Sequence, residues 1–579
     1  MDIKGIPASF GIAIGNVYLL KQKTYIPDSA PIQSGDIESE IRRFIKGRDL
    51  SVCQLEKIYT EVLAKRGEDE AELFQGYIEI LTDEDMANEI VQKIRNELVN
   101  AEAAADGAVK HAIAEVEALA NPYLRGRADD LRDIGRRLVC NIADKELFDS
   151  VPVLQDAAVV IGHEITPSDF AQMDVSKVVG LACEIGGITS HIAIMAKMLA
   201  IPSVVGATGI TDSVSGGNLV ILDGTEGTII INPSESMLTL YRDKKQSCEQ
   251  EKQHLSALAD LPAVTRDGKR VELLANIGTD KDVEAAIRNG AEGIGLYRTE
   301  FLFMDRASFP TEEDQFEAYK AVAKAMKGKK VIIRTVDIGG DKALSYIEFR
   351  KEENPFLGWR AVRLYQDYPQ MIRTQLRAIL RASAYGCVKI LFPMIISVEE
   401  TQELKRIAAE LKAELSREKI AFDENIEMGV MIETPAAALI SDVLAKEVDF
   451  FSIGTNDLTQ YTLAVDRGNN RIANLYNSLH PSVIRLIKIV ADNAHAHGKV
   501  VGMCGELAGD PKAAGLLLGL GVDELSMSAI RIGKIKDTVM NISYDDATHW
   551  AQEVLKVGSS AEVSGILSGM KTSATVKGL

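Results

Sequence analysis

The chain has 579 residues, several times the roughly 100 to 200 residues of one domain, so we expect two or three folded units. Hydrophobic residues make up 46% and charged residues 26% of the sequence, which excludes a fibrous or globally disordered protein. The net charge of -19 opposes non-specific binding to nucleic acid or anionic lipid. The six cysteines include no C-x-x-C pair, no secretory signal opens the chain, and no run of about 18 apolar residues occurs. Together these features predict a cytoplasmic protein.

The first half of the chain predicts an α/β domain that is interrupted by helices. Residues 1–24 combine Gly and Pro with β-branched residues, which is typical of short strands and turns. In residues 25–148 Pro and Gly become rare and apolar residues recur at helical spacing, which predicts about four long helices. Residues 149–235 contain four strand-like runs around one short helical run. We expect the first strands to join this later segment, so that the helical subdomain is an insertion.

The second half predicts a closed barrel. Residues 236–262 have the polar, periodic character of a linker helix. In residues 263–579 short apolar runs alternate with amphipathic helices, a pattern of parallel strands with helical crossovers, and a count of eight strands favours a (β/α)8 TIM-type barrel. The eight runs are VELLANI, GIGLYRTE, KVIIRTVDIG, VKILFPMI, MGVMIET, FFSIGTND, KVVGMCGE and VDELSMS.

Polar residues end most of these eight runs. In a TIM-type barrel the active site is built at the carboxyl ends of the strands. For any one of these residues a cap or turn role is the more common explanation, but the whole set facing one mouth predicts a functional site. The set comprises Asn276, Arg298, Arg334, Glu433, Asn456, Asp457, Cys504 and Ser526.

The residue types at this mouth fit a small phosphorylated acid and a metal ion. Arg298, Arg334 and Arg467 offer planar forks for phosphate and carboxylate, so we expect the mouth to be locally basic. Glu433 and Asp457 are hard oxygen ligands of the kind that Mg²⁺ shares with substrate oxygens. The alternative is that Glu433 only pairs with a nearby arginine.

Cys504 lies between two glycines, which would allow a ligand to approach closely. A lone cysteine at a strand end is more often inert packing. A reactive thiol needs an electropositive site, which the three arginines would supply, and Cys504 is then a candidate proton donor or acceptor.

His191 is the one histidine in a distinctive setting. A strand and a Gly186-Gly187 turn precede it, Thr189 and Ser190 occupy N-cap positions, and His191 opens a helix. A helix N-terminus favours an anion, and histidine is a competent nucleophile for phosphoryl transfer. A structural histidine buried at the start of a helix is the alternative.

These motifs resemble those of the phosphoenolpyruvate-protein phosphotransferase family, Enzyme I of the bacterial sugar phosphotransferase system. The resemblance spans nearly the whole chain, up to about Ser559. It is carried by GIPASFGIAIG, GGITSHIAIMAK, KEENPFLGWRA, GTNDLTQY and MCGELAGD, of which the last two are highly specific.

The resemblance implies roles for particular residues. His191 would be phosphorylated on the ring nitrogen distal to the backbone, Cys504 would protonate the enolate carbon, and the Thr166 hydroxyl would fix the histidine ring. Phosphoenolpyruvate and Mg²⁺ would be held by the remaining set, with Asp457 shared between them: Arg298, Arg334, Asn456, Asp457 and Arg467 for the substrate, and Glu433 and Asp457 for the metal.

The resemblance also implies partners. The chain would pass the phosphoryl group to the phosphocarrier protein HPr, docked on the helical insertion, and would form a homodimer through the barrel. The segment 68–85 contains eight acidic and no basic residues, together with Leu73, Phe74 and Tyr77. It is either a solvated helix face or a surface that attracts a basic carrier.

Two departures from the family pattern stand out: Ile188 replaces an arginine three residues before the histidine, and Phe10 replaces a proline. The first would slow transfer or alter partner choice, and the second is structural. Two other functions stay open. A dikinase or synthase relative would carry an additional nucleotide-binding domain, and a sensor that binds phosphoenolpyruvate without transfer would lack some of the arginines, acids or the histidine.

Overall fold

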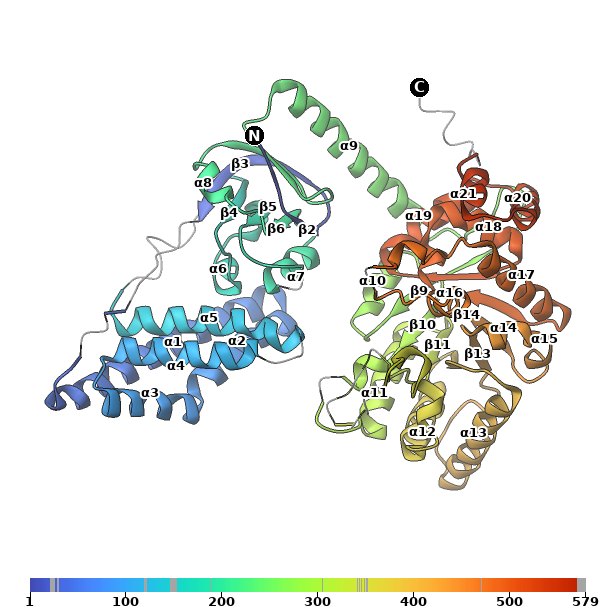
Figure 1. Cartoon of the computed structure of the whole chain (residues 1–579), viewed down its shortest axis with the longest axis horizontal. Helices are drawn as coiled ribbons and strands as arrows, with labels where there is room; N and C mark the ends of the chain where they lie inside the picture. Colours follow the sequence, from blue (N-terminus) through green and yellow to red (C-terminus); the bar gives the residue numbers. More distant parts are fainter. Residues whose placement is uncertain are drawn as a thin grey trace. The chain divides into compact units, whose positions relative to one another are not determined.

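The computed structural model describes residues 1–569 except 21–26, 29–30, 119–121, 146–153, 189, 305, 341, 343, 345, 348, 350–351 and 470. The chain forms two compact units, Met1–Gln250 and Glu251–Leu579, joined through one long helix (Figure 1). None of the described helices has both the length and the apolar character needed to cross a membrane.

The first unit contains one eight-stranded sheet built from both ends of its sequence. The long early strand β3 (Ile12–Leu20) pairs in parallel with β4 (Ala158–Gly162) and antiparallel with β7 (Leu219–Asp223). The helices between β3 and β4 are therefore inserted between two neighbouring strands of one sheet. The order is β1-β8-β7-β3-β4-β5-β6-β2. The remaining strands are β1 (Asp2–Lys4), β2 (Ile6–Ser9), β5 (Val178–Cys183), β6 (Ser203–Val205) and β8 (Thr228–Ile231), and the helices of this part are α6 (Pro167–Ala171), α7 (His191–Met198) and α8 (Ile210–Ser213).

The helical subdomain has five described helices where the sequence pattern predicted about four. Gly67 has φ 95°, a left-handed conformation that suits glycine, and it breaks one apolar periodicity into two helices. Phe74 and Tyr77 are buried in the core of this bundle. The helices are α1 (Ile37–Arg66), α2 (Glu68–Thr82), α3 (Glu84–Glu97), α4 (Ala101–Glu117) and α5 (Pro122–Ile142).

The second unit is the expected closed barrel of eight parallel strands. Helix α9 (Glu235–Ala257) leads into it, and β16 closes the ring by pairing with β9. The strands are β9 (Glu272–Ile277), β10 (Ile294–Arg298), β11 (Val331–Arg334), β12 (Val388–Phe392), β13 (Met428–Ile432), β14 (Phe450–Ile453), β15 (Val500–Met503) and β16 (Glu524–Met527). The helices are α10 (Asp282–Arg288), α11 (Glu312–Ala325), α12 (Pro369–Ser383), α13 (Val398–Glu418), α14 (Pro435–Leu439), α15 (Ser441–Leu444), α16 (Thr455–Leu463), α17 (Pro481–Ala496), α18 (Pro511–Leu520), α19 (Ala529–Met540), α20 (Tyr544–Lys556) and α21 (Ser560–Gly569).

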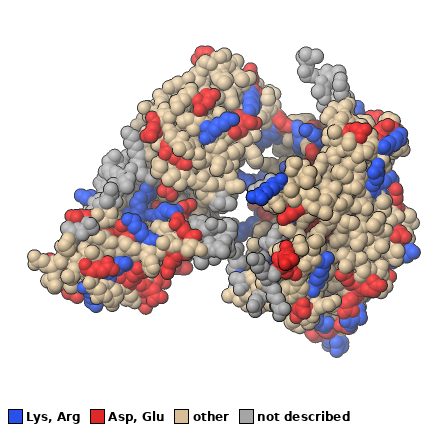
Figure 2. Space-filling model, viewed as in Figure 1, with Lys and Arg blue, Asp and Glu red and all other residues tan. Residues whose placement is uncertain are grey.

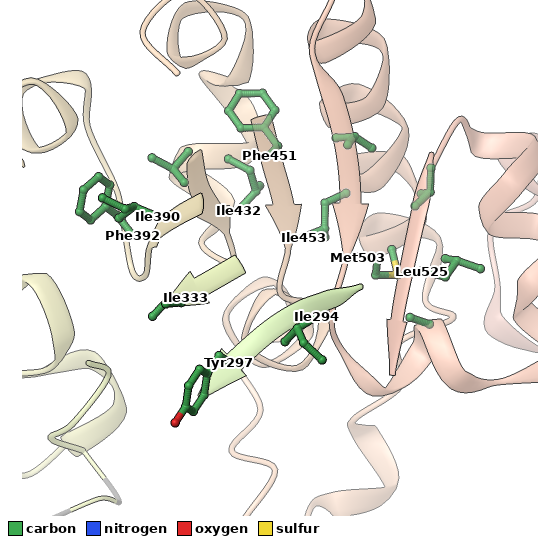
Figure 3. Packing of buried hydrophobic residues seen from close by; sticks show 14 of the residues in the cluster. Ile294, Tyr297, Ile333, Ile390, Phe392, Ile432, Phe451, Ile453, Met503 and Leu525 are labelled. Atoms are coloured by element: carbon green, nitrogen blue, oxygen red, sulfur yellow. The ribbon is translucent and has the colours of Figure 1, made fainter. Parts of the chain in front are cut away.

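Alternation along the strands divides the barrel core into two layers. One set of side chains, including Phe451, Ile453 and Met503, packs in the large cluster with the surrounding helices (Figure 3). The other set points into the barrel and forms a small separate cluster. That inner cluster consists of Leu296, Ile332, Leu391, Met431, Phe450 and Cys504. One predicted site residue is therefore part of the interior packing.

Candidate active site

The strand-end residues of the barrel line a cavity of about 320 Å³ at its mouth. Arg298 ends β10, Arg334 ends β11, and Cys504 directly follows β15. The structure brings together most of the predicted set around this cavity: Arg298, Arg334, Glu433, Asn456, Asp457, Arg467 and Cys504. Asn276 lines a neighbouring cavity of about 640 Å³ and accepts a hydrogen bond from the Ser526 hydroxyl.

Two of the three predicted arginines have a buried nitrogen without a hydrogen-bond partner among the described residues, although Arg467 Nη1 forms a long ion pair with Asp457 Oδ2 at 3.7 Å. Arg334 Nε and Arg467 Nη1 make no hydrogen bond within the described part of the chain. A buried donor that stays unpaired is costly, typically about 1–3 kcal/mol, so such groups need an explanation. Both nitrogens belong to residues that line the 320 Å³ cavity. An anionic ligand in this cavity would satisfy them.

The two predicted metal ligands are buried carboxylates that repel each other. Burial, Asp457 and Asp337 raise the pKa of Glu433 to about 8. One Glu433 oxygen accepts a hydrogen bond from the Met394 N–H at 2.6 Å, and no ion pair with an arginine occurs for Glu433 among the described residues. The alternative of a simple Glu433–arginine pair is therefore not supported. Two hard oxygen donors that line the same cavity as the arginines fit a divalent cation.

The described residues contain no group of three or more His, Cys, Asp or Glu side chains arranged to hold a metal. A cation at Glu433 and Asp457 would therefore complete its coordination with substrate oxygens or water, as Mg²⁺ commonly does.

Cys504 is a buried thiol with a hydroxyl neighbour. Burial raises its pKa, whereas the hydrogen bond from Ser452 lowers it. Ser452 Oγ donates to Cys504 Sγ at 3.3 Å, and Sγ lies 3.7 Å from the carbonyl oxygen of Ile453. A buried thiol with a raised pKa carries its proton at neutral pH, so it is better suited to give a proton than to act as a thiolate nucleophile.

His191 lies in the first unit, as the first residue of α7. Its Nε2, the nitrogen distal to the backbone, lies 3.3 Å from Oδ1 of Asp130 on α5, and Tyr77 donates its hydroxyl to the same oxygen at 2.7 Å. Ser190 is the N-cap residue, but its hydroxyl donates to the Gly187 carbonyl oxygen and does not cap the helix. Thr189 lies outside the described residues.

Three family models match the chain in succession. They are the N-terminal domain (residues 4–127), the mobile domain (residues 154–227) and the PEP-binding domain (residues 252–544) of PEP-utilising enzymes. The chain is 49% identical to a phosphoenolpyruvate-protein phosphotransferase of Haemophilus influenzae, with 98% of each protein covered. Proteins of the same description from Buchnera aphidicola and Staphylococcus carnosus are 47% and 44% identical, with 98% and 97% of this chain and 99% and 98% of the relatives covered. The chain belongs to the phosphoenolpyruvate-protein phosphotransferase family.

For a member of this family of PEP-utilising enzymes, which work with a divalent metal, the mouth of the barrel is less basic than expected. The cavity lining contains four basic residues, Arg298, Arg334, Lys342 and Arg467, and four acidic ones, Glu300, Asp337, Glu433 and Asp457. The mouth is therefore not strongly basic in the protein alone, because Arg334 and Lys342 are paired with Glu300 and Asp337.

Arg360 is the most notable residue of this site that the sequence reasoning missed. It is fully buried, and its Nε and Nη2 donate to the two Asp337 oxygens at 2.7 and 2.8 Å. Its Nη1 donates to Asp457 Oδ1 at 3.1 Å. Arg360 lies in the connection between β11 and α12 and does not end a strand, so inspection of the strand ends does not find it. The only sequence feature that could have pointed to Arg360 is the motif FLGWRA, which is part of the family resemblance.

Three further residues that the sequence singled out occupy defined positions in the first unit of this phosphotransferase. Thr166 caps α6, where its hydroxyl accepts a hydrogen bond from the Asp169 N–H at 3.2 Å, and α6 packs against α7. Ile188, at the position where the family resemblance implies an arginine, is 62% exposed, and Phe10 is 65% exposed. Compared with the implied arginine, the exposed Ile188 lacks a positive charge near His191, and its side chain is not packed in the hydrophobic core.

Proposed function

We propose that the chain transfers the phosphoryl group of phosphoenolpyruvate to its own His191 and then to HPr, releasing pyruvate, as the first step of the sugar phosphotransferase system. The observation that carries this proposal is the mouth of the barrel, where buried nitrogens of Arg334 and Arg467 that make no hydrogen bond within the described residues share one cavity with the carboxylates of Glu433 and Asp457. A sensor that binds without transfer would not need this complete set together with a histidine at a helix start.

In this proposal the arginines and the amide at the mouth hold the substrate. Arg298, Arg334, Asn456, Asp457 and Arg467 bind phosphoenolpyruvate, and Glu433 and Asp457 hold Mg²⁺. When bound, Mg²⁺ offsets the negative charge on the phosphoryl group and on the enolate that is left behind. The arginines would orient the same groups by paired hydrogen bonds.

His191 attacks phosphorus through its distal nitrogen Nε2. A nitrogen–phosphorus bond forms, the bond from phosphorus to the enol oxygen breaks, and the enolate carbon takes the proton of Cys504 to give pyruvate. Because Nε2 contacts Asp130, the ring has to leave this carboxylate before it reacts. We assign to Thr166, on the helix packed against α7, the role of fixing the ring during transfer.

The nucleophile and the substrate site belong to different units, so the reaction needs relative movement of the two. We assign residues 1–24 and 149–235 to a mobile phosphohistidine domain, 25–148 to a carrier-docking insertion, 236–262 to the linker and 263–579 to the barrel. We also propose a cytoplasmic homodimer that contacts its partner through the barrel.

The docking surface for HPr is the acidic side of α2 and α3. Acidic side chains gather on the helical part of the first unit (Figure 2), and Glu72, Glu79, Asp83, Glu84 and Asp85 are exposed there. Phe74 and Tyr77 face the bundle core and do not contribute to this surface. The side chain of Glu68 lies outside the described residues. Long-range attraction would then bring a basic carrier to the helices.

The test is phosphorylation of the purified full chain by radiolabelled phosphoenolpyruvate with Mg²⁺. We expect acid-labile label on the wild type and on His111→Ala, which removes an exposed histidine of α4, and no label on His191→Ala. Chase with HPr should remove the label. Absence of label on the wild type, or equal label on His191→Ala, would overturn the proposal.

A further inference from the structure

Ser452 lies inside the barrel beside the thiol of Cys504. In β14, alternate residues face opposite sides: Phe451 and Ile453 pack in the outer cluster, while Phe450 belongs to the inner cluster with Cys504. Ser452 shares the inward face with Phe450 and is buried. A buried hydroxyl needs a hydrogen-bond partner, and the Ser452 hydroxyl donates to the sulfur of Cys504 at 3.3 Å.

The sulfur and the backbone of Cys504 are fixed by two neighbouring residues of the same strand. The Cys504 N–H donates to the Ile453 carbonyl oxygen at 3.1 Å, which fixes the main chain next to β14. The same carbonyl oxygen lies 3.7 Å from Sγ, a long contact that holds a thiol proton only weakly. The Ser452 hydroxyl is therefore the shorter of the two contacts that orient the sulfur.

We propose that Ser452 is a positioning residue for protonation of the enolate: it holds the sulfur of Cys504 through a donated hydrogen bond and stabilises the thiolate that forms. The inference rests on the proposed function, in which Cys504 supplies the proton. In that step the S–H bond breaks, the electron pair of the enolate forms a C–H bond at the terminal carbon, and the enolate oxygen becomes the keto oxygen of pyruvate. The negative charge moves to sulfur, where a hydroxyl donor already points.

The thiolate regains its proton from water before the next turnover. Cys504 lines both the 320 Å³ cavity and the neighbouring 640 Å³ cavity, so one side of the residue faces the proposed substrate site and the other a second, larger space. Asn276, Thr279 and Ser528 give that second space a polar lining that suits water.

The experiment measures pyruvate formation by the full chain with Mg²⁺, phosphoenolpyruvate and excess HPr, in H₂O and in D₂O. For Ser452→Ala we expect kcat to fall about tenfold with KM for phosphoenolpyruvate within about twofold, and the solvent isotope effect on kcat to increase because protonation becomes slower. Ser452→Thr keeps the hydroxyl and should restore most of kcat. Ser441→Ala removes a buried hydroxyl elsewhere in the barrel and is the matched control.

The double variant Ser452→Ala/Cys504→Ala separates the two proposals. If Ser452 acts through the thiol, the double variant should be no slower than Cys504→Ala alone. Ser452→Ala with normal kcat, or a further multiplicative loss in the double variant, would overturn the role of Ser452 and leave the proposed function intact. Normal pyruvate formation by Cys504→Ala would instead overturn the role of Cys504 as the acid, and the inference with it.

Discussion

Glu433 is a carboxyl group whose pKa is raised to about 8 by burial and by the charges of Asp457 and Asp337. In the metal-free protein it therefore holds a proton below about pH 8, and a divalent cation has to displace that proton. We expect the affinity for Mg²⁺ to weaken as the pH falls from about 8 to about 6, by about tenfold per pH unit. Calorimetric titration in two buffers of different ionisation enthalpy measures both the affinity and the released proton. Glu433→Gln should release none, and a wild-type affinity that is flat over this range would contradict the assignment.

Arg360 connects the carboxylates of the site through the buried contacts to Asp337 and Asp457. Arg360→Met keeps much of the volume but leaves these acids with fewer cations, so we expect the barrel to lose about 3 kcal/mol of unfolding free energy. Both tryptophans of the chain, Trp359 and Trp550, lie in the barrel unit, so their fluorescence in urea follows that unit alone. Arg406→Met, which removes an exposed guanidinium from α13, should leave the urea midpoint nearly unchanged. An equal shift of the urea midpoint in the two variants would show that the buried ion pairs of Arg360 contribute no more to stability than an exposed ion pair does.

The residues that sequence reasoning found and missed differ in where they stand relative to strand ends. Arg298 and Arg334 end strands, so the barrel rule locates them. Ser452 precedes the last residue of β14, where a small residue looks like ordinary strand packing, and Arg360 is placed by a loop between β11 and α12. Neither position follows from periodicity, because a buried hydrogen bond depends on two segments meeting in space.

At the level of elements, the eight barrel strands were all predictable, because each is an apolar run of four to six residues between helices. Strand β6 of the first unit has only three residues, too few to show a period, and its place between β5 and β2 comes from the sheet. The break between α1 and α2 depends on the backbone conformation of Gly67. A single glycine inside a helical pattern is not sufficient to predict the end of a helix.

Helices α2 and α3 carry the predicted electrostatic attraction for the carrier. We expect Glu72→Gln/Glu84→Gln, which neutralises two exposed acids, to lower the association rate constant for HPr several-fold at low salt and to flatten its dependence on ionic strength. Stopped-flow association at several salt concentrations measures both. Glu403→Gln/Glu410→Gln on barrel helix α13 is the control of equal charge change. If the association rate constant depends on ionic strength equally in the wild type and in the α2–α3 variant, this surface does not attract the carrier electrostatically.

On the scale of the whole molecule, α9 is one continuous helix whose two ends belong to different units. At its start Leu238 is buried, and Lys244 pairs with Asp223 of β7 at 2.7 Å. Near its end His254 lies 2.9 Å from Asp537 of α19, and Glu251 pairs with Lys534. Residues 245–250 lie between these contacts, so we place the hinge of the proposed movement there.

A break in this stretch should affect one transfer and spare the other. Ser247→Pro removes a helix hydrogen bond and disrupts the helix within 245–250, whereas Ser247→Ala preserves it. Because α9 is the covalent connection between the unit that carries His191 and the unit that carries the proposed substrate site, we expect Ser247→Pro to slow phosphorylation of His191 by phosphoenolpyruvate about tenfold or more. In the proposed function, transfer of the phosphoryl group from His191 to HPr involves only the first unit, so it should keep its wild-type rate. Rapid-quench measurement of the two half-reactions distinguishes them, and an equal loss in both, or in neither, would place the hinge elsewhere.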